Sequence, residues 1–224
     1  MSEQQRSAKA RKYQMNKRAE QVDTTRQRIV DAAVALHGSV GPARTTISGV
    51  AEQAGVTRLT VYRHFADEEA LFSACSSHWL SQQQLPDPAA WRELSDPLER
   101  LHAGLTDLYR FYRGGESMLR NIYGDWAALP EKHRTALQER DAFFRDQLLE
   151  PFPEPGSGLL RAVVAHSVSF WTWRSLCHDN GLPNEDAVHA MTGLAAMTAS
   201  LRQDATPLSQ PGPDQGGSAL PPSL

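Results

Sequence analysis

The chain has 224 residues, of which 40% are hydrophobic and 22% are charged, and its formal net charge is −3. This length suits one long or two small globular domains with ample material for a core. The two cysteines exclude a disulfide framework or a cysteine-rich metal site, and we expect Cys75 and Cys177 to be reduced thiols. No N-terminal signal segment and no run of 18 apolar residues is present, which predicts a cytoplasmic protein without a membrane span.

The charge is divided unevenly along the chain. Residues 1–65 contain 11 Lys and Arg against 5 Asp and Glu, whereas residues 66–224 contain 12 against 21. A basic N-terminal part on an acidic remainder is typical of a protein that contacts a polyanion with one end. A charge asymmetry without function is the alternative.

The first 22 residues are basic and almost free of branched apolar side chains, so they cannot bury a core of their own. We expect a disordered arm or a frayed helical extension. Such an arm would add electrostatic affinity for DNA or enter the minor groove, or it would be a solubilising tail with no further role. Its basic residues are Arg6, Lys9, Arg11, Lys12, Lys17 and Arg18.

The next element is a helix that we expect to begin at Thr24 and to end between Gly38 and Gly41. Thr24 and Gln27 have the spacing of a capping box. The helix would turn one apolar stripe inward, formed by Ile29, Ala32, Ala33 and Leu36.

Residues 45–65, TTISGVAEQAGVTRLTVYRHF, predict two short helices joined by a tight turn. Thr46 and Thr57 are the expected N-caps, and Gly55 supplies the turn. The second helix keeps Val61 and Phe65 inward. Its other sides carry groups that bind phosphates and base edges, namely Arg58, Leu59, Thr60, Tyr62, Arg63 and His64. A helix of this kind can read a DNA major groove, and an ordinary helical hairpin is the alternative.

The segment 24–72 resembles the DNA-binding domain of the tetracycline-repressor (TetR) family of bacterial regulators. The matching pieces are RQRIVDAAVALHGSVG, TTISGVAEQAGV, TRLTVYRHF and ADEEALF. The chain departs from the family at Glu68, where Lys is usual, so the resemblance does not carry a phosphate contact at that position.

Candidate DNA contacts follow from side-chain chemistry and from this resemblance. Arg58 and Arg63 suit guanine edges or phosphate, and Leu59 and Thr60 suit a thymine methyl group. The resemblance implies phosphate contacts for Tyr62, for His64 and for the start of the preceding helix. The predicted DNA-binding residues are Arg44, Thr45, Thr46, Thr57, Arg58, Leu59, Thr60, Tyr62, Arg63 and His64.

The remainder predicts helices and no convincing strand. Asp67 caps a helix that leads away from the DNA-binding unit, and Pro86-Asp87-Pro88 marks the domain joint. Further helices are expected over 97–113, 116–129, 130–150, 159–179 and 184–202. The predicted fold is therefore all-α with about nine helices: a basic disordered arm (1–22), a three-helix DNA-binding domain (23–66), a helical effector-binding and dimerisation domain (67–202) and a disordered tail (203–224).

The last two predicted helices suit a dimer interface. The helix over 159–179 is apolar on several sides, and the final helix interleaves apolar with small residues that permit close approach. A four-helix interface between two copies is also what the family resemblance implies, so we expect a homodimer.

The resemblance further implies a small-molecule pocket in the C-terminal domain, and such pockets are mostly apolar with a few orienting polar groups. The expected polar groups are His102, Asp125, Arg145 and His166. For each candidate, ordinary structural packing is the alternative. The predicted ligand-binding residues are His102, Leu105, Tyr109, Tyr112, Ile122, Tyr123, Trp126, Phe144, His166, Phe170 and Trp173.

Enzymatic activity is not expected. The sequence has no phosphate-binding glycine loop, no G-x-S-x-G and no H-E-x-x-H, so we predict no catalytic residue, metal or cofactor. The sequence predicts a ligand-responsive repressor that a partly apolar small molecule releases from a palindromic operator in double-stranded DNA. The alternatives are an activator of the same fold and a helical binding or scaffold protein without a specific DNA site.

Overall fold

The computed structural model describes residues 3–153 and 158–203, and within these residues every regular element is a helix. This confirms the predicted all-α class, with eleven α-helices in the described residues where about nine were expected. The two short ones, α5 (Pro88–Arg92) and α10 (Phe170–Trp173), account for the difference. The predicted tail lies outside the described residues apart from Gln203.

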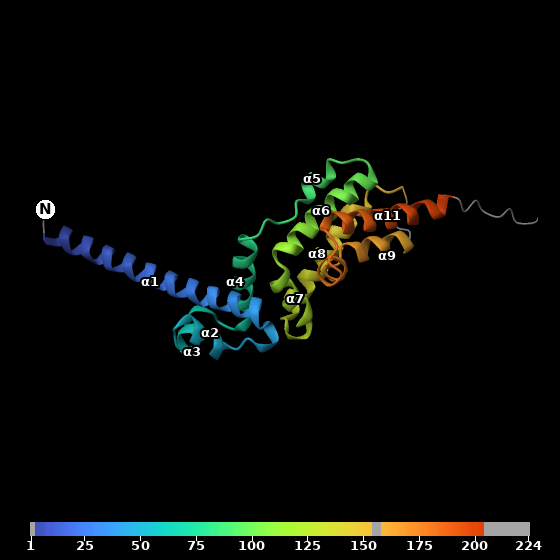
Figure 1. Ribbon diagram of the computed structural model, residues 1–224. Coiled ribbons are helices and arrows are strands. Elements are labelled where there is room, and N and C mark those ends of the chain that lie inside the picture. The colour runs from blue at the N-terminus through green and yellow to red at the C-terminus, as the bar shows by residue number, and fades with distance from the viewer. Residues whose placement is uncertain (1–2, 154–157, 204–224) are drawn as a thin grey trace, which may run out of the picture.

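The molecule divides into two parts, which we call the head (α1–α4) and the body (α5–α11) (Figure 1). The head consists of α1 (Glu3–Ser39), the 3-10 turn η1 (Pro42–Arg44), α2 (Ile47–Ala54), α3 (Arg58–His64) and α4 (Glu68–Ser81). α1 packs against both α2 and α4, so it is the element around which the head is assembled. The most deeply buried side chains of the head are Ile29, Val30, Ala33, Val50 and Val61.

Local side-chain chemistry sets the helix boundaries of the head. The hydroxyls of Thr46 and Thr57 accept hydrogen bonds from the backbone of Gly49 (3.1 Å) and Thr60 (3.2 Å), which confirms both predicted N-caps. Gly55 ends α2 with φ 64°, a left-handed conformation that glycine adopts without strain. The caps and this turn fix the angle at which α3 leaves α2.

The structure corrects the expected start of the first helix. α1 begins at Glu3 and continues without a break to Ser39, so residues 3–22 form the helical extension that was one of the two alternatives and not a disordered arm. Thr24 lies within this helix, and its hydroxyl donates to the carbonyl of Glu20 (2.8 Å) instead of capping. The upstream residues contain no Gly or Pro and are rich in good helix formers, which allows the helix to extend past the predicted cap. This extension projects beyond α2 and α3 (Figure 1).

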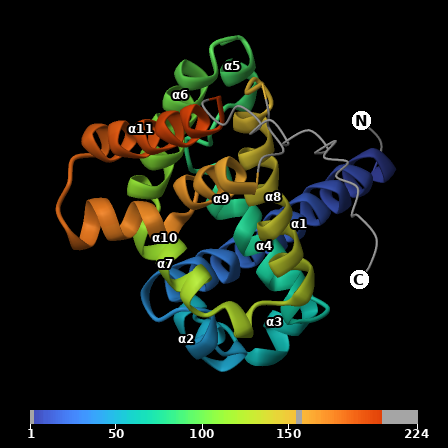
Figure 2. The same cartoon turned by 90° about the vertical axis from the view of Figure 1, so that its right-hand side faces the viewer.

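The body is built around α6 (Pro97–Gly114). Its inward face is almost completely buried and consists of Leu101, Leu105, Leu108, Tyr109 and Tyr112. The remaining elements are α7 (Glu116–Gly124), η2 (Trp126–Ala128), α8 (Glu131–Leu149), α9 (Gly158–Ser167), the π-helical turn η3 (Arg174–Asp179) and α11 (Asn184–Gln203). Both α8 and α11 pack on α6, and α9 packs on α8 and α11 (Figure 2).

The helix predicted over 159–179 is broken in the structure. α9 ends at Ser167, and Ser169 caps the short α10 by accepting from the backbone of Trp171 (3.2 Å). The carbonyls left free at the break are satisfied from α6: Tyr109 donates to Ser167 O (2.9 Å) and Tyr112 to Val168 O (2.6 Å). These donors are more than 50 residues away in sequence, so no local pattern reveals the break.

Of the remaining predicted helix starts, one differs by a single residue and one agrees. Pro130 precedes α8 and does not occupy its first position, because α8 begins at Glu131. Asn184 is the first residue of α11, and its side-chain oxygen accepts from the indole N–H of Trp173 (3.1 Å). Asn184 therefore ties α11 to α10.

Candidate nucleic-acid interface and the adjoining cavity

The outward face of α3 carries the groups that the sequence singled out for DNA. Val61 is fully buried and Phe65 is 3% exposed, so they hold α3 on the head. Leu59 and Tyr62 are 61% and 44% exposed. Arg58 and Arg63 are exposed as well, while Thr60 and His64 are half-buried. Basic, aromatic and small groups thus share the one helix surface that faces away from the head core.

The predicted contacts before α3 are partly engaged within the head. Arg44 donates through Nε to the carbonyl of Val40 (2.8 Å), and the hydroxyl of Thr45 donates to Gly41 O (2.9 Å). The hydroxyl of Thr57 lies 2.9 Å from that of Thr60, in addition to its capping bond. Thr46 and Thr57 therefore orient the helix N-termini whether or not they also reach a phosphate.

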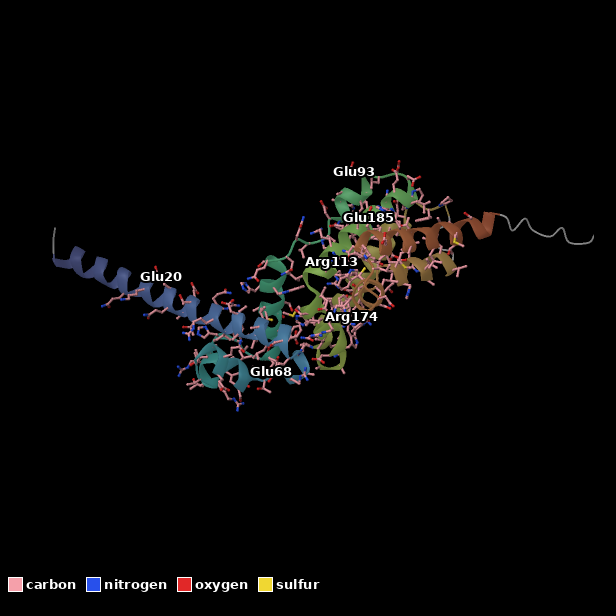
Figure 3. The ribbon with its side chains drawn as sticks, viewed as in Figure 1. Glu20, Glu68, Glu93, Arg113, Arg174 and Glu185 are labelled. Carbon is pink, nitrogen blue, oxygen red and sulfur yellow. The ribbon has the colours of Figure 1, made fainter. Side chains whose placement is uncertain are left out.

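Glu68 occupies the first turn of α4 and is exposed (Figure 3). A carboxylate there stabilises the N-terminal end of α4 through the helix dipole. It places a negative charge where a phosphate-binding Lys was expected from the family. The guanidinium of Arg26 covers the ring of Phe65 at 4.9 Å, which steadies the end of α3.

A cavity of about 200 Å³ lies where head and body meet, and we call it the joint cavity. It opens between the end of α1, one face of α4, and α7 and α8 of the body. Its lining is mostly apolar, with few polar atoms. The lining residues are His37, Phe72, Cys75, Ser76, Trp79, Leu80, Met118, Leu119, Ile122, His133, Ala136, Leu137 and Arg140.

Of the predicted ligand-binding residues, the structure places Ile122 alone in the lining of the joint cavity. Most of the others are buried in the body core: Leu105, Tyr109, Tyr112, Phe144, Phe170 and Trp173. Tyr123 and Phe170 border a second cavity of about 310 Å³, and His166 borders a third of about 250 Å³. His102 packs near His189, and Trp126 lies in η2.

No sequence motif marks the two histidines and the arginine that line the joint cavity. His133 and Arg140 lie two turns apart on α8, and His37 lies on α1, so only the folded chain brings His37 and the two α8 residues to one cavity.

His37 and Cys75 form a buried polar pair at the wall of the joint cavity. Nδ1 of His37 lies 3.2 Å from the Cys75 sulfur, and the imidazole packs on the ring of Phe72. Burial lowers the pKa of His37 to about 4, against the opposing charge of Asp125. Burial also raises the pKa of the Cys75 thiol to about 12. Both groups are therefore neutral near pH 7.

Short polar contacts tie the body to the end of α1. The amide of Asn121 on α7 donates to the carbonyls of His37 (2.8 Å) and Gly38 (3.0 Å). Asp125 accepts a hydrogen bond from the backbone N–H of Ala43 (2.9 Å). Gly41 lies against this carboxylate with φ 87°, and a Cβ there would come within 2.3 Å of Asp125 Oδ2. Asp125, expected to orient a ligand, thus joins α7 to the head.

Across residues 3–153 and 158–203, no three His, Cys, Asp or Glu side chains are grouped so as to hold a metal ion. Within the same part of the chain, no helix has the length and apolar character needed to cross a membrane.

Known protein sequences are similar to this chain in the head. Residues 29–75 match the family of bacterial regulatory proteins described as the tetR family. The HTH-type transcriptional regulator AcrR of Shigella flexneri is 40% identical over 57 residues, which cover 25% of this chain and 26% of AcrR. The probable acrEF/envCD operon repressor of Escherichia coli (strain K12) is 37% identical over 81 residues, covering 36% and 32%. The match thus spans about a quarter to a third of these relatives.

Solved structures share the fold over most of the chain. AibR, crystallised with isovaleryl coenzyme A and operator DNA, superposes with a TM-score of 0.54 at 23% identity, covering 76% of this chain and 97% of AibR. A TetR-like transcriptional regulator from Rhodococcus sp. RHA1 gives a TM-score of 0.56 at 18% identity, covering 79% and 96%. The head therefore matches the tetR family of bacterial regulatory proteins in sequence, and most of the chain shares its fold with these solved structures.

Proposed function

We propose that this protein is a transcriptional regulator that binds a palindromic operator in duplex DNA and is released from it by a small molecule, acting as a repressor. The observation that carries the proposal is the outward face of α3, where Arg58, Tyr62 and Arg63 are exposed beside Leu59. A B-DNA major groove of roughly 12 Å admits one helix, and these groups match base edges and phosphates. We place the protein in the cytoplasm and assign it no catalytic activity.

A homodimer gives the operator its two-fold symmetry. Large apolar side chains remain exposed on and next to the helices predicted to pair, with exposures of 50% for Leu159, 40% for Leu194 and 68% for Met197. Pairing of α9 and α11 with a second copy would cover them. Each copy would then present α3 to one half-site, and the two half-sites would lie roughly 34–36 Å apart, or one helical turn of DNA.

The joint cavity is the proposed effector site. It lies between α4, which belongs to the head, and α7 and α8, which belong to the body. A molecule that spreads these walls would tilt the head, because Asn121 and Asp125 already fix α7 to the end of α1. To release DNA, the effector must bind the tilted conformer more tightly than the DNA-bound one, since equal affinities would shift nothing.

The basic extension of α1 should add affinity without adding sequence preference. Deleting residues 2–17 removes Arg6, Lys9, Arg11, Lys12 and Lys17. Each phosphate contact contributes about 0.9 to the slope of log affinity against log salt, so we expect the slope to become shallower by roughly 2 or more per dimer. Fluorescence anisotropy of labelled duplex at increasing salt measures this slope. An unchanged slope would leave the extension without a role on DNA.

Two alternatives to a repressor are tested by different measurements, the first by the same salt titration and the second by a reporter gene. A helical scaffold without a DNA site would show no duplex binding for salt to weaken. An activator of the same fold would bind DNA as the repressor does, and a reporter gene under the operator would then rise instead of fall when the protein is expressed.

A further inference from the structure

The joint cavity carries a net positive charge although its lining is mainly apolar. Arg140 is the one lining residue that carries a full charge near pH 7. Burial lowers the pKa of both His37 and His133, and burial raises the pKa of the Cys75 thiol, so these three groups are neutral there. No carboxylate belongs to the lining. An amine entering this cavity would meet a guanidinium and no counter-ion.

Arg140 is held in place with part of its guanidinium unused. Its Nε lies 3.2 Å from an Asp141 oxygen, and its Nη2 donates to that carboxylate and to the hydroxyl of Tyr123. Burial alone would lower the pKa of Arg140, but Tyr123 and Asp141 outweigh it and raise that pKa, so the cation is permanent. Nη1 has no hydrogen-bond partner among the described residues. Asp141, which pairs with Arg140, borders the second cavity. The joint cavity is therefore lined by the guanidinium of Arg140 and not by the carboxylate of Asp141.

A second polar atom of the lining also lacks a partner. Nδ1 of His133 is buried, and no described residue bonds to it. Nε2 of the same ring lies 3.3 Å from the Ser73 hydroxyl, and the ring edge packs on Phe72 at 4.5 Å between centroids. In the tautomer whose Nε2 accepts from the Ser73 hydroxyl, Nδ1 carries the proton and is a donor. An unpaired buried donor is costly, so an acceptor on a bound molecule would stabilise this site.

We propose that the effector of the joint cavity is a small organic acid, with a compact apolar body between α4 and α7 and a carboxylate directed to Arg140 and His133. This inference rests on the proposed function, in which the joint cavity is the effector site. The volume of about 200 Å³ lies below the roughly 300–1,000 Å³ of sites for drug-sized ligands, so the body of the acid is short. Trp79, Leu119 and Leu137 supply apolar walls for it.

Three probes with the same chain and different head groups test the proposal: octanoate, octan-1-ol and octylamine. Calorimetry on the full-length protein without DNA measures their binding. We expect octanoate to bind about tenfold or more tightly than octan-1-ol, because a charge-assisted hydrogen bond is roughly twice as strong as a neutral one. Octylamine should bind most weakly. Equal or tighter binding of octylamine, or no binding of any probe, would overturn the proposal.

Variants assign the effect to the cavity. Arg140→Gln should bring octanoate down to the affinity of octan-1-ol and leave octan-1-ol within about twofold, since only the charge is lost. If that variant fails to fold, Arg140→Met with Asp141→Asn removes both charges together, and the same loss is expected. Leu137→Trp should block octanoate and octan-1-ol alike, and Thr135→Trp, on an exposed site of the same helix, should not.

The readouts separate this inference from the proposed function. If the protein binds a specific DNA sequence but does not prefer octanoate, the proposed organic-acid effector is wrong and the proposed regulator function stands. Octanoate binding that survives Leu137→Trp would place the acid elsewhere. If the protein binds octanoate but selects no DNA sequence, the proposed regulator function is wrong, and the joint cavity is a carboxylate-binding site without that function.

Discussion

Replacing Arg58 by Ala is expected to weaken operator binding by about 2–6 kcal/mol per dimer while binding to random duplex DNA changes little. A bidentate arginine–guanine contact discriminates by about 1–3 kcal/mol, and a dimer makes it twice. The side chain is exposed on the outer face of α3 and supports no other part of the head, so its loss should not unfold the protein. Anisotropy titrations with operator and scrambled duplexes at equal salt measure the two affinities.

Tyr62 provides the contrasting result. If its hydroxyl positions a phosphate, Tyr62→Phe should weaken operator and scrambled duplexes by the same factor. Gln53→Ala, an exposed change on α2 outside the predicted contacts, is the matched control and should leave both affinities unchanged. If Arg58→Ala lowers both affinities equally, the assignment of Arg58 as a base reader is wrong.

His37 should make the stability of the protein fall in mild acid. Its pKa is about 4 in the folded protein against 6.5 when exposed, so between these values the unfolded state binds more protons. The contribution of neutral His37 to the free energy of unfolding is therefore fully present above pH 6.5 and is lost as the pH falls toward 4. For this shift the loss between pH 7 and pH 5 is about 2 kcal/mol. Urea unfolding at the two pH values measures it.

The variant His37→Gln isolates this contribution. Glutamine does not titrate, so the loss of stability between pH 7 and pH 5 should shrink by about 2 kcal/mol relative to the unmodified protein. His133, whose pKa burial also lowers, titrates with the same sign in both proteins and cancels in the comparison. An identical pH dependence of the two proteins would show that His37 is not buried as a neutral side chain at the joint of head and body.

The elements of the head were predictable because their signals are local. Each cap is decided within about four residues: Thr46 and Thr57 reach the third residue ahead, and Gly55 is selected by one dihedral angle. Val61 and Phe65 were expected inside from helical spacing alone, and both are buried. The outward face of α3 was predictable for the same reason, because the side chains of α3 that do not face the core are the ones available to contact DNA.

The joint cavity was not predictable for the opposite reason. Its walls come from four helices that meet only in the folded chain, and the aromatic side chains expected to line it became core instead, as Tyr112 and Phe170 show. The break after Ser167 depends on hydroxyls donated from α6, far away in sequence. The start of α1 was misplaced because Thr24 and Gln27 have capping spacing, while the residues before them favour continuing the helix.

The central claim, that two copies of this chain read a palindromic DNA sequence through α3, is tested most directly by selection from a random duplex pool. The pool is bound to the full-length protein at about 150 mM salt, near physiological ionic strength, and the retained fraction is sequenced. The predicted result is a palindromic consensus whose half-sites lie about one helical turn apart, and whose base preference relaxes in Arg58→Ala. Retention of duplexes without any consensus, or no retention, would contradict the account.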